Sequence, residues 1–370
     1  MMKHIARLTG AIVATTLAVA TLGAAPAVAA KPKKHTVAAE AWLMKQLQDG
    51  LIPSSYGGYN YGPSIDAALS ILAAHGKTAD ARKIAKAVEA NEATAYTDSD
   101  YCANDDFSYY SPAPCTDKPA DAHEYSGTSS GVAKALYLAE KSGVGSKAAL
   151  TAKVESMLAS DGSIHDSVLV DGVPDTSGTN DYANPLYQAY AAVSLSLAKS
   201  PKAKLALRYL VGQQCADGAF PATYDGCSAD GSGDELDTTS FAVWLLHDAG
   251  LAPAAVKKSA AWLLKQQAKD GSFDHGANST GLAAQALHVV GKAAAARKAS
   301  RWLVAHQVPK CPAGTPLAGL AGAVAFDSAA VKAARANGWK AASDQWLYAA
   351  AQALPALAYA PKAKTKVTCR

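Results

Sequence analysis

The sequence predicts an almost entirely α-helical protein that closes into a ring of six helical hairpins. Three observations lead to this prediction. Alanine and other apolar residues recur at helical spacing, and 49% of the 370 residues are hydrophobic. One unit, made of a helix, an Asp-Gly turn, a polar loop and a second helix, recurs along the chain. A single hairpin cannot bury its apolar face, so neighbouring copies must stack, and six of them can close on themselves.

The N-terminal residues have the pattern of a secretory signal peptide. Lys3 and Arg7 precede an apolar run at 12–22, and small residues follow at 27–29. The apolar run is shorter than the roughly 20 residues that a membrane-spanning helix needs. We therefore expect residues 1–30 to be removed, the mature protein to be secreted, and no transmembrane segment.

Residues 31–37 form a short basic tail that we expect to be solvated. Without the leader the chain holds 33 basic and 31 acidic residues, a formal charge of about +2, because the leader contributes Lys3 and Arg7 and no acid. Phosphate binding needs a concentrated basic face, so this balance argues against nucleic acid as a partner.

The body of the ring is expected over residues 38–360, followed by a C-terminal tail at 361–370. Two copies of the unit match residue by residue. The later copy contains Trp262-Leu263, Gln266-Gln267, Asp270-Gly271-Ser272-Phe273, Asn278-Ser279-Thr280 and a closing Gly291; the earlier contains Tyr209-Leu210, Gln213-Gln214, Asp217-Gly218-Ala219-Phe220, Asp237-Thr238-Thr239 and Gly250.

Four further copies are looser but complete the set of six. They are marked by Trp42-Leu43 with Asp49-Gly50, Asp66 and Gly76; by Tyr125 to Thr128 with Gly143; by Met157-Leu158 with Asp161-Gly162 and Asp181; and by Trp302-Leu303 with His306-Gln307 and Asp344 to Leu347. The Gly after each Asp supplies a left-handed backbone position at no steric cost.

Two inserts interrupt the repeats, at about 98–124 and 311–342, and we expect them to form lids or rims of the ring. Six cysteines in an exported chain form an even set, and an oxidising destination favours pairing. Their spacing suggests three local disulfides, although other connectivities stay open: Cys102 with Cys115, Cys215 with Cys227, and Cys311 with Cys369. No CxxC or HExxH motif occurs, so no metal site is expected.

The repeated pattern of Trp-Leu, Gln-Gln, Asp-Gly-Ser-Phe and Asp/Asn-Thr/Ser-Thr resembles the prenyltransferase and squalene oxidase repeat. That repeat occurs in terpene cyclases, in protein prenyltransferase β subunits and in the transcobalamin family. The resemblance covers roughly residues 38–360 and is strongest over 205–308. It implies an (α/α)6 toroid with a central cavity, in a class that includes both enzymes and pure binders.

The catalytic signatures of those families are not matched. Class II terpene cyclases protonate the substrate with the middle Asp of a DxDD motif. When the stretch 234–239 is aligned on Asp237, Leu236 takes the place of the proton donor. The prenyltransferase zinc ligands and the complement-type thioester are also missing, and the chain has no room for the C-terminal β domain of transcobalamins.

The inner helices of such a toroid begin at one mouth, so the polar residues that start the second helix of each unit should form a ring there. These residues also suit helix caps, since Asp, Asn and Ser accept from free backbone N–H groups. The ligand-binding candidates are Asp66, Tyr125, Asp181, Tyr182, Asp237, Thr238, Asn278, Asp344 and Trp346, with Ser279 beside them.

Other polar groups fall on loops at the predicted mouth. Each of three histidines has an acid beside it in the sequence, in the pairs His123-Glu124, His165-Asp166 and Asp274-His275. Adjacent residues rarely face each other on a regular element, so we interpret these pairs as loop surface.

The leading functional hypothesis is a secreted protein that binds an extracellular small molecule or a cell-envelope partner in the mouth, without catalysis, as a monomer and without a cofactor. The first alternative is a glycan-active or other hydrolytic enzyme on an (α/α)6 scaffold, because Asp105-Asp106 beside Phe107, Tyr109 and Tyr110 would suit a sugar. The second is a terpenoid cyclase-like enzyme that lacks the usual proton donor. Aromatic residues make up only 7% of the chain, which is thin for stabilising carbocations.

Overall fold

The structure is a computed structural model that describes residues 33–54, 59–91, 101–103, 110–112, 123–170, 173–175, 177, 180–227 and 233–370. The predicted signal peptide, the Asp105-Asp106 stretch and Cys115, the expected partner of Cys102, lie outside these residues. In the described part of the chain no helix is both long and apolar enough to cross a membrane.

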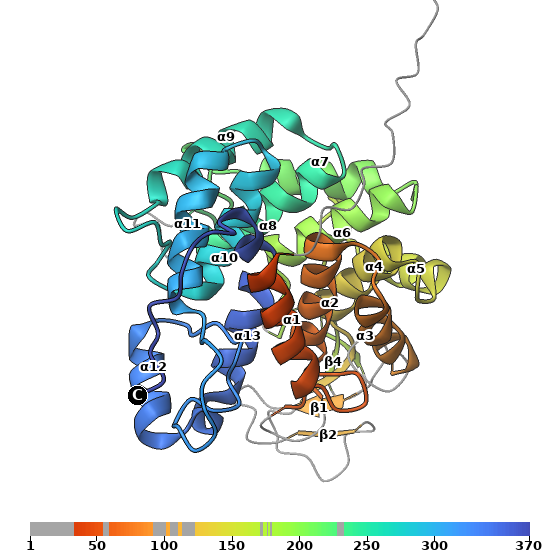
Figure 1. The fold of residues 1–370 in the computed structure, drawn as a ribbon. Coiled ribbons are helices and arrows are strands. Elements are labelled where there is room, and N and C mark those ends of the chain that lie inside the picture. The colour runs from red at the N-terminus through yellow and green to blue at the C-terminus, as the bar shows by residue number, and fades with distance from the viewer. Residues whose placement is uncertain are drawn as a thin grey trace, which may run out of the picture. The chain divides into compact units, whose positions relative to one another are not determined.

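Six inner helices form a closed ring. Each contacts the next around the ring, and the sixth contacts the first, so α13 lies beside α2 and α1 although they come from opposite ends of the chain (Figure 1). This confirms the predicted (α/α)6 toroid. The inner helices are α2 (Tyr61–His75), α4 (Ser129–Ser142), α6 (Pro185–Leu197), α8 (Gly233–Asp248), α10 (Ala277–Val289) and α13 (Ser343–Ala353).

The outer helices cover this ring, and five of them pack chiefly on the inner helix that precedes them in the chain. The first, α1, has no preceding inner helix and packs instead on α13 and on the short helix η2 (Pro355–Tyr359), which completes the outer layer. The outer helices are α1 (Lys34–Gln46), α3 (Ala79–Ala90), α5 (Lys147–Ser156), α7 (Ala203–Gly212), α9 (Pro253–Gln266) and α11 (Ala293–His306); α12 (Ser328–Asn337) and η1 (Trp339–Ala342) lie in the second predicted insert.

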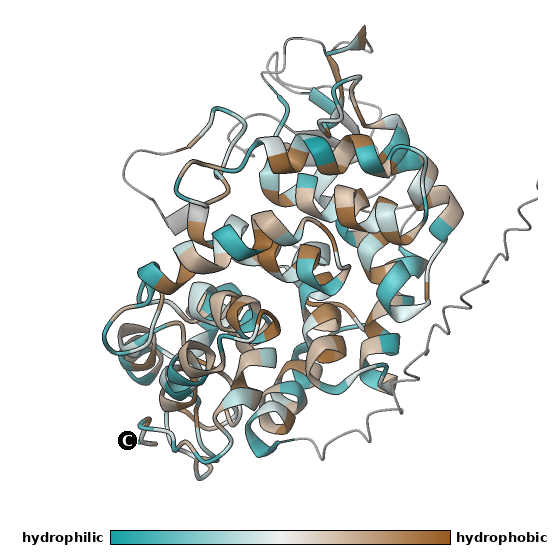
Figure 2. Ribbon diagram, turned by 90° about the horizontal axis from the view of Figure 1, so that it is seen from above, coloured by the Kyte–Doolittle hydropathy of each residue, from teal (hydrophilic) through white to brown (hydrophobic). Residues whose placement is uncertain are grey.

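The two layers differ in sequence because they differ in burial. The outer helix α3 buries only Ala81, Ile84, Ala85 and Val88, one stripe at helical spacing. The inner helix α10 is buried nearly all round, over residues 279–287 without a break. Figure 2 accordingly shows hydrophilic as well as hydrophobic residues on most helices, as expected where one face is solvated.

The Asp-Gly turns hold successive outer helices together. Gly218 and Gly271 have φ of 112° and 103°, as the sequence predicts. They also lie against the next outer helix: a Cβ at either position would come within 2.7 Å of the backbone oxygen of Lys258 or Lys298, respectively. These glycines therefore allow both a left-handed turn and a close approach of two backbones.

The second Gln of each Gln-Gln pair makes the same contacts in successive units, which explains why this residue recurs. Gln267 Nε2 donates to the oxygen of Gly271 at 3.1 Å and to that of Ala295 at 3.0 Å, so one amide links the turn of its own unit to the start of the next outer helix. Gln214 Nε2 similarly reaches the oxygen of Ala255 at 2.9 Å. We call this arrangement the junction clamp.

The same clamp closes the ring. Gln307 Nε2 donates to the oxygen of Gly322 at 3.0 Å and to that of His35, on α1, at 2.9 Å. His35 Nδ1 lies 2.7 Å from Gln307 Oε1, and its Nε2 lies 3.1 Å from the oxygen of Ala363. The last unit is thus fastened to the first by the same interaction that joins units elsewhere.

One departure from the prediction is a small antiparallel sheet of five strands in the order β2-β1-β3-β4-β5. The chain was expected to be almost entirely helical, yet the end of the first insert pairs with Ser167–Val170, whose consecutive β-branched and apolar residues suit an extended strand. The strands are β1 (Tyr101–Ala103), β2 (Tyr110–Pro112), β3 (His123–Gly127), β4 (Ser167–Val170) and β5 (Val173–Pro174).

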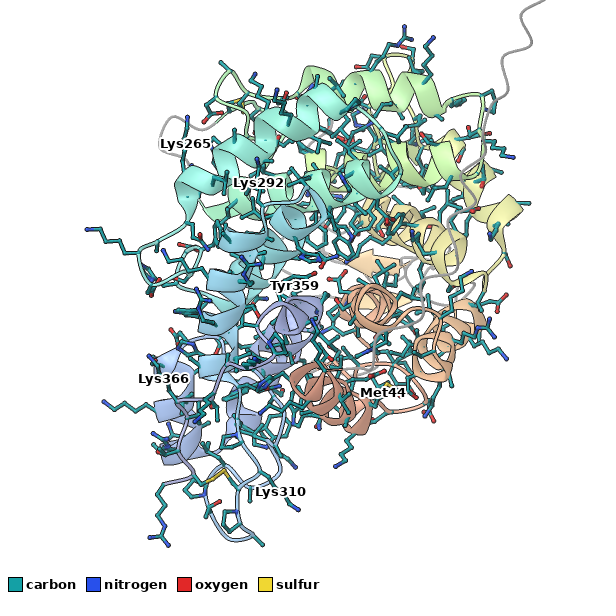
Figure 3. All side chains as sticks on the ribbon, turned by 45° about the horizontal axis from the view of Figure 1, so that its top comes forward. Met44, Lys265, Lys292, Lys310, Tyr359 and Lys366 are labelled. Carbon is teal, nitrogen blue, oxygen red and sulfur yellow. A yellow bond between two sulfur atoms is a disulfide. The ribbon has the colours of Figure 1, made fainter. Side chains whose placement is uncertain are left out.

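Two of the predicted disulfides are confirmed. Cys215 pairs with Cys227 and Cys311 with Cys369, with Cα atoms 5.8 and 5.4 Å apart. The second bond, yellow near Lys310 in Figure 3, ties the C-terminal tail to the insert that follows α11.

Candidate functional site

A cluster of acids, one histidine and one serine lies where α4 and α6 begin. The loop that leads from α5 to α6 passes the first residue of α4, and its side chains bind one another there. We call this group, consisting of Asp161, Ser163, His165, Asp166 and Asp181, the mouth cluster.

His165 stands at the centre of the mouth cluster. Its Nδ1 lies 2.5 Å from Asp181 Oδ2, and its Nε2 lies 2.7 Å from Ser163 Oγ. Ser163 Oγ in turn lies 2.6 Å from Asp161 Oδ1. The order of groups along this chain is the one found in a Ser-His-Asp triad, with a second carboxylate behind the serine.

The proton positions that these contacts require differ from those of a nucleophilic triad. An ionised carboxylate can only accept, so the Ser163 hydroxyl donates to Asp161 and its oxygen accepts from His165 Nε2. The imidazole then donates from both nitrogens, which makes it an imidazolium. Ser163 is 2% exposed, so its oxygen is covered as well as fully engaged.

The electrostatics of the cluster agree with this assignment. The hydrogen bond to Asp181 raises the pKa of His165, against an opposing effect of burial. Burial alone would raise the pKa of Asp181, but the hydrogen bonds from His165 and from the backbone N–H groups of Asp166 and Ala183 leave that pKa lowered. The two partners hold each other in their charged forms.

Asp166 connects the cluster to both inner helices. Its Oδ1 accepts from the backbone N–H of Ser129, the first residue of α4, at 2.6 Å, and its Oδ2 accepts from that of Tyr182 at 3.1 Å. Burial raises the pKa of Asp166 despite these two hydrogen bonds. The mouth therefore holds two aspartates whose pKa values shift in opposite directions.

Tyr224 covers one side of the cluster. Its hydroxyl donates to Gln188 Oε1 at 3.1 Å, its ring lies 6.3 Å from that of His165 between centroids, and it meets the ring of Tyr209 edge to face at 5.5 Å. Burial raises the pKa of Tyr224. This tyrosine remains a neutral hydrogen-bond donor beside the charged pair.

Inside the ring lies a buried ion pair between neighbouring inner helices. Lys134 Nζ on α4 lies 2.6 Å from Asp66 Oδ1 on α2, and both side chains are nearly inaccessible. Gln352 Nε2 on α13 reaches Asp66 Oδ2 at 3.4 Å, and Asn278 Nδ2 on α10 donates to Gln352 Oε1 at 2.9 Å. Four inner helices are thus joined by one polar line.

A row of aromatic rings fills the adjoining part of the ring. Tyr137, Tyr190, Phe241 and Trp244 follow one another with centroids 5.6, 5.7 and 6.1 Å apart. Lys134 Nζ lies 5.8 Å from the centroid of Tyr190. None of these four aromatic residues is more than 7% exposed, so solvent barely reaches them.

The structure corrects the helix-cap interpretation of several predicted site residues. The residues before α2, α10 and α13 are Asn60, Gly276 and Ala342, and none of them caps its helix through a side chain. Asp66 and Asp237 lie inside α2 and α8, well past the first residue. At α6 the cap is Asn184, which accepts from the backbone N–H groups of Leu186 and Tyr187. The sequence misplaced these helix starts because polar residues also occur inside buried helices.

The remaining predicted residues are spread over different environments. Tyr182 is exposed, while Thr238 and Trp346 are buried on α8 and α13. Asp344 lies in the first turn of α13, where a negative charge suits the helix end. Only the backbone of Tyr125 is described, in β3. Ser279 is buried beside Asn278.

Two of the histidines that have an acid beside them in the sequence lie against a different acid in the structure. His165 binds Asp181, 16 positions away, rather than its neighbour Asp166. His275 Nδ1 lies 3.8 Å from Asp270 rather than against Asp274. Across the described ranges, no group of three or more His, Cys, Asp or Glu side chains could hold a metal ion.

Sequence reasoning missed Lys134, Gln352 and Tyr224. A signal for the first was present, because Lys134 interrupts the apolar run from Val132 to Ala139 at a position that faces the core, where a lysine needs a partner. The other two give no such signal, since Gln352 belongs to an ordinary Ala-rich helix and Tyr224 to a loop.

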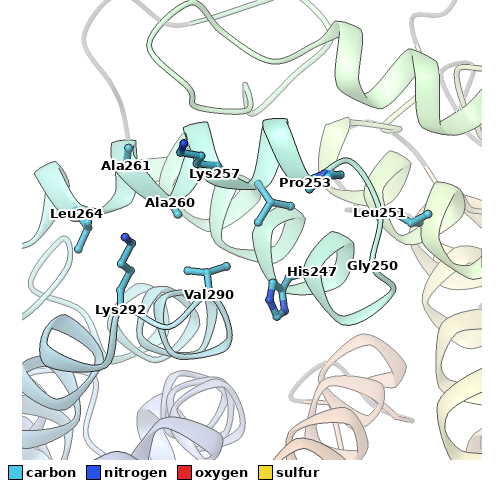
Figure 4. Close-up of a pocket in the computed structure, with 11 residues that line it drawn as sticks. His247, Gly250, Leu251, Pro253, Lys257, Ala260, Ala261, Leu264, Val290 and Lys292 are labelled. Atoms are coloured by element: carbon cyan, nitrogen blue, oxygen red, sulfur yellow. The ribbon is translucent and has the colours of Figure 1, made fainter. Parts of the chain in front are cut away.

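A separate groove of about 430 Å³ lies on the outside, between the end of α8, the helix α9 and the end of α10 (Figure 4). Leu251, Val256, Leu264 and Val290 give it apolar walls, and Lys292 lies at its edge. It is at the opposite ends of α8 and α10 from the mouth.

Comparisons with known proteins agree with the fold. Type II terpene cyclase MstE from Scytonema, solved with its substrate geranylgeranyl dihydroxybenzoate, has a TM-score of 0.56 at 14% identity, covering 88% of this chain and 96% of the cyclase. Its complex with the product merosterolic acid A gives 0.54 at 17% identity, covering 88% and 96%. A protein from Actinoplanes gives 0.57 at 16% identity, covering 88% and 98%. No family model and no curated protein matches the sequence.

These likenesses show that the chain has the α/α-toroid fold of the terpene cyclases. At such low identity they show the fold alone, and the chemistry of the solved enzymes has to be tested against the residues present here.

Proposed function

We propose that the mature chain is an exported protein that binds an extracellular small molecule or a cell-envelope partner at the mouth of the ring, without converting it. The observation that carries this proposal is the state of the mouth cluster. Its Ser-His-Asp arrangement is saturated by the protein's own hydrogen bonds, and the serine oxygen is buried and donates its proton away from the histidine.

The interior of the ring supports binding at the mouth rather than deep in the lumen. The aromatic row and the Lys134–Asp66 pair occupy space that a long isoprenoid would need. Leu236 stands where a cyclase would carry its proton donor, and its side chain is buried in α8. Tyr182, by contrast, is 47% exposed beside the mouth cluster and offers an aromatic surface with a hydroxyl group.

Native mass spectrometry tests this proposal. The mature protein would be purified from the medium into which it is secreted, and its native mass compared with its denatured mass. We expect a stoichiometric excess mass that decreases strongly in Tyr182→Ala and persists in Leu264→Ala, a matched loss of an exposed side chain on the outer groove. No excess mass, or an equal loss in both variants, would contradict binding at the mouth.

A second candidate function is favoured by one observation. Asp166 and Asp181 have pKa values shifted up and down, and such a divergence separates a general acid from a base or nucleophile in glycan-cleaving enzymes. In this reading Asp166 would donate the proton. The structure engages both of its oxygens with backbone N–H groups, so the acid would have to release at least one of them during turnover.

The two candidates differ in what purified protein does to a polysaccharide panel. Turnover that Asp166→Asn abolishes while the melting temperature is retained would establish the enzyme and overturn the binder. Absence of turnover together with a bound mass would support the binder.

A further inference from the structure

A second cavity, of about 890 Å³, lies on the outer side of the last two units. Its walls are the loop at 270–275, the exposed face of α11, the start of α12 and the C-terminal tail at 363–367. We call it the C-terminal groove. Its volume lies within the range of sites that hold small ligands.

The wall formed by the tail is fixed in place. Besides the Cys311–Cys369 disulfide, the backbone N–H of Lys366 donates to the oxygen of Ala305 at 2.9 Å. Arg335 Nη2 donates to the oxygen of Thr368 at 2.6 Å and to its Oγ1 at 3.0 Å. The groove is therefore preformed, which lowers the entropic cost of binding.

The charge of the groove is unbalanced. Four cationic side chains line it against two carboxylates, and within the part of the chain that the structure describes none of the four forms a salt bridge. Both carboxylates already accept a hydrogen bond from a nearby backbone N–H group. Asp270 accepts from Ser272 at 3.0 Å, and Asp327 accepts from Ala330 at 2.7 Å. The cations are Arg301, Arg335, Lys364 and Lys366.

An aromatic surface lies among these charges. The ring of Trp302 is half-buried in the wall, and the ring of His306 lies tilted against it, with centroids 3.9 Å apart. His306 is held by the oxygen of Trp302 at 2.9 Å and by Ser328 Oγ at 3.2 Å. The side chain of Trp302 also hydrogen-bonds to Asp270, which holds the indole in orientation as an apolar part of the groove wall.

The loop that carries Asp270 and His275 has a strained backbone. Asp274 and His275 have φ of 49° and 50°, two consecutive left-handed residues that are not glycine. The corresponding residues of the preceding copy, Pro221 and Ala222, do not share this conformation. Such strain persists where the surroundings require it, and it concentrates at binding and catalytic sites. Here it holds the His275 side chain, which is 78% exposed, at the edge of the groove.

We propose that the C-terminal groove binds a carboxylated oligosaccharide, that is, a chain of uronic acid sugars. Pyranose rings have apolar faces that pack on an indole, and guanidinium groups match carboxylates in charge and in the geometry of their hydrogen bonds. Sugar hydroxyls can be met by His275. This site is independent of the mouth and does not rest on the function proposed for it.

Calorimetric titration of the folded mature protein with a trimer of galacturonic acid tests this proposal, with a neutral galactose trimer as the comparison ligand. We expect the acidic trimer to bind, binding to weaken as salt is raised, and the neutral trimer to bind at least 10-fold more weakly. Trp302→Ala and the double variant Arg301→Gln with Lys366→Gln should each weaken binding of the acidic trimer about 10-fold or more.

The matched control is Lys265→Gln with Lys310→Gln, which removes two cations outside the groove; Figure 3 shows both lysines and also Lys366, which extends from the tail. This control should bind the acidic trimer like the parent protein, and all variants should keep the parent melting temperature within a few degrees. The proposal is overturned if the acidic trimer does not bind at millimolar concentration, if both trimers bind equally, or if the control loses as much affinity as the groove variants. Should Trp302→Ala misfold, the arginine and lysine double variant decides alone.

Discussion

The junction clamps and the His165–Asp181 contact of the mouth cluster are distributed in opposite ways along the repeats. A clamp in which a glutamine side chain donates to the oxygen of a turn glycine and to an oxygen on the next outer helix recurs at Gln267 and Gln307, and Gln214 makes the same contacts. Among the residues that the structure describes, the contact of His165 with Asp181 occurs in one unit only. A repeat protein thus carries its own internal comparison: a contact found in several copies serves the stacking of copies, and one found once is free to serve function.

The buried Lys134–Asp66 pair belongs to the unrepeated class, and breaking it should give the largest effect on stability. Lys134→Met leaves the Asp66 carboxylate uncompensated inside the ring, which we expect to lower the free energy of unfolding by about 3–5 kcal/mol. Chemical denaturation measures this value. The double variant Lys134→Met with Asp66→Leu should recover most of the loss, and a double variant as unstable as the single one would contradict the pairing.

Gly271 tests the contribution of a contact that recurs between neighbouring units. In Gly271→Ala the new Cβ would meet the Lys298 backbone oxygen, and the left-handed φ adds strain, so a loss of about 2–4 kcal/mol is expected. Gly291→Ala provides the matched control, because its φ is 78° and no atom lies within 4 Å of a Cβ there. It should lose only about 1 kcal/mol. Equal losses, measured by denaturation, would mean that the close approach at the clamp contributes nothing beyond backbone strain.

Gln267 tests the clamp itself with a smaller expected effect. Gln267→Ala removes the donor to the oxygens of Gly271 and Ala295, and we expect a loss of about 1–2 kcal/mol in the free energy of unfolding. Its neighbour Gln266 is exposed, so Gln266→Ala should change stability by less than about 0.5 kcal/mol. If both substitutions cost the same, the recurrence of the second glutamine needs another cause.

The mouth cluster should show the smallest effect on stability and the clearest effect of pH. The pKa of His165 is raised in the folded state, so its contribution to stability is complete below the unfolded pKa and is lost as the pH rises through the folded one. The pKa of Asp181 is lowered, so its contribution is present above its ordinary value and is lost as the pH falls through the lowered one. The pair therefore contributes most between these two limits.

Titration of His165 by NMR measures this coupling directly. In Asp181→Asn the pKa of His165 should fall towards the ordinary value, whereas Asp166→Asn should change it less, because Asp166 acts on His165 only as a more distant charge. An unchanged pKa in Asp181→Asn would show that the short Nδ1 contact does not control the protonation of this histidine.

The fold could be predicted from the sequence because the same motifs recur in successive units. The Gln-Gln and Asp-Gly pairs occur at fixed distances from two apolar helices, so stacking follows without knowledge of any long-range contact. Two cysteine pairs could be placed from the spacing of the cysteines along the chain.

The candidate site could be predicted only in part. Asp181 was singled out as the start of an inner helix, but its role depends on His165, which lies on the far side of a strand pair. Asp66 was assigned to the mouth and lies instead against Lys134 inside the ring. Both errors have one cause: a single sequence shows which residues are polar, whereas their partners are set by how neighbouring helices stack.

Closure by the Gln307 clamp has a consequence for the order of the chain. Because Gln307 bonds to His35 and Ala363 lies against the same histidine, the beginning and the end of the described chain meet at a junction like any other. The closed ring therefore does not require the chain to begin and end at this particular junction. A circular permutant in which a short linker joins the two ends, and in which the chain is opened between α9 and α10, should keep every clamp except the one next to the cut.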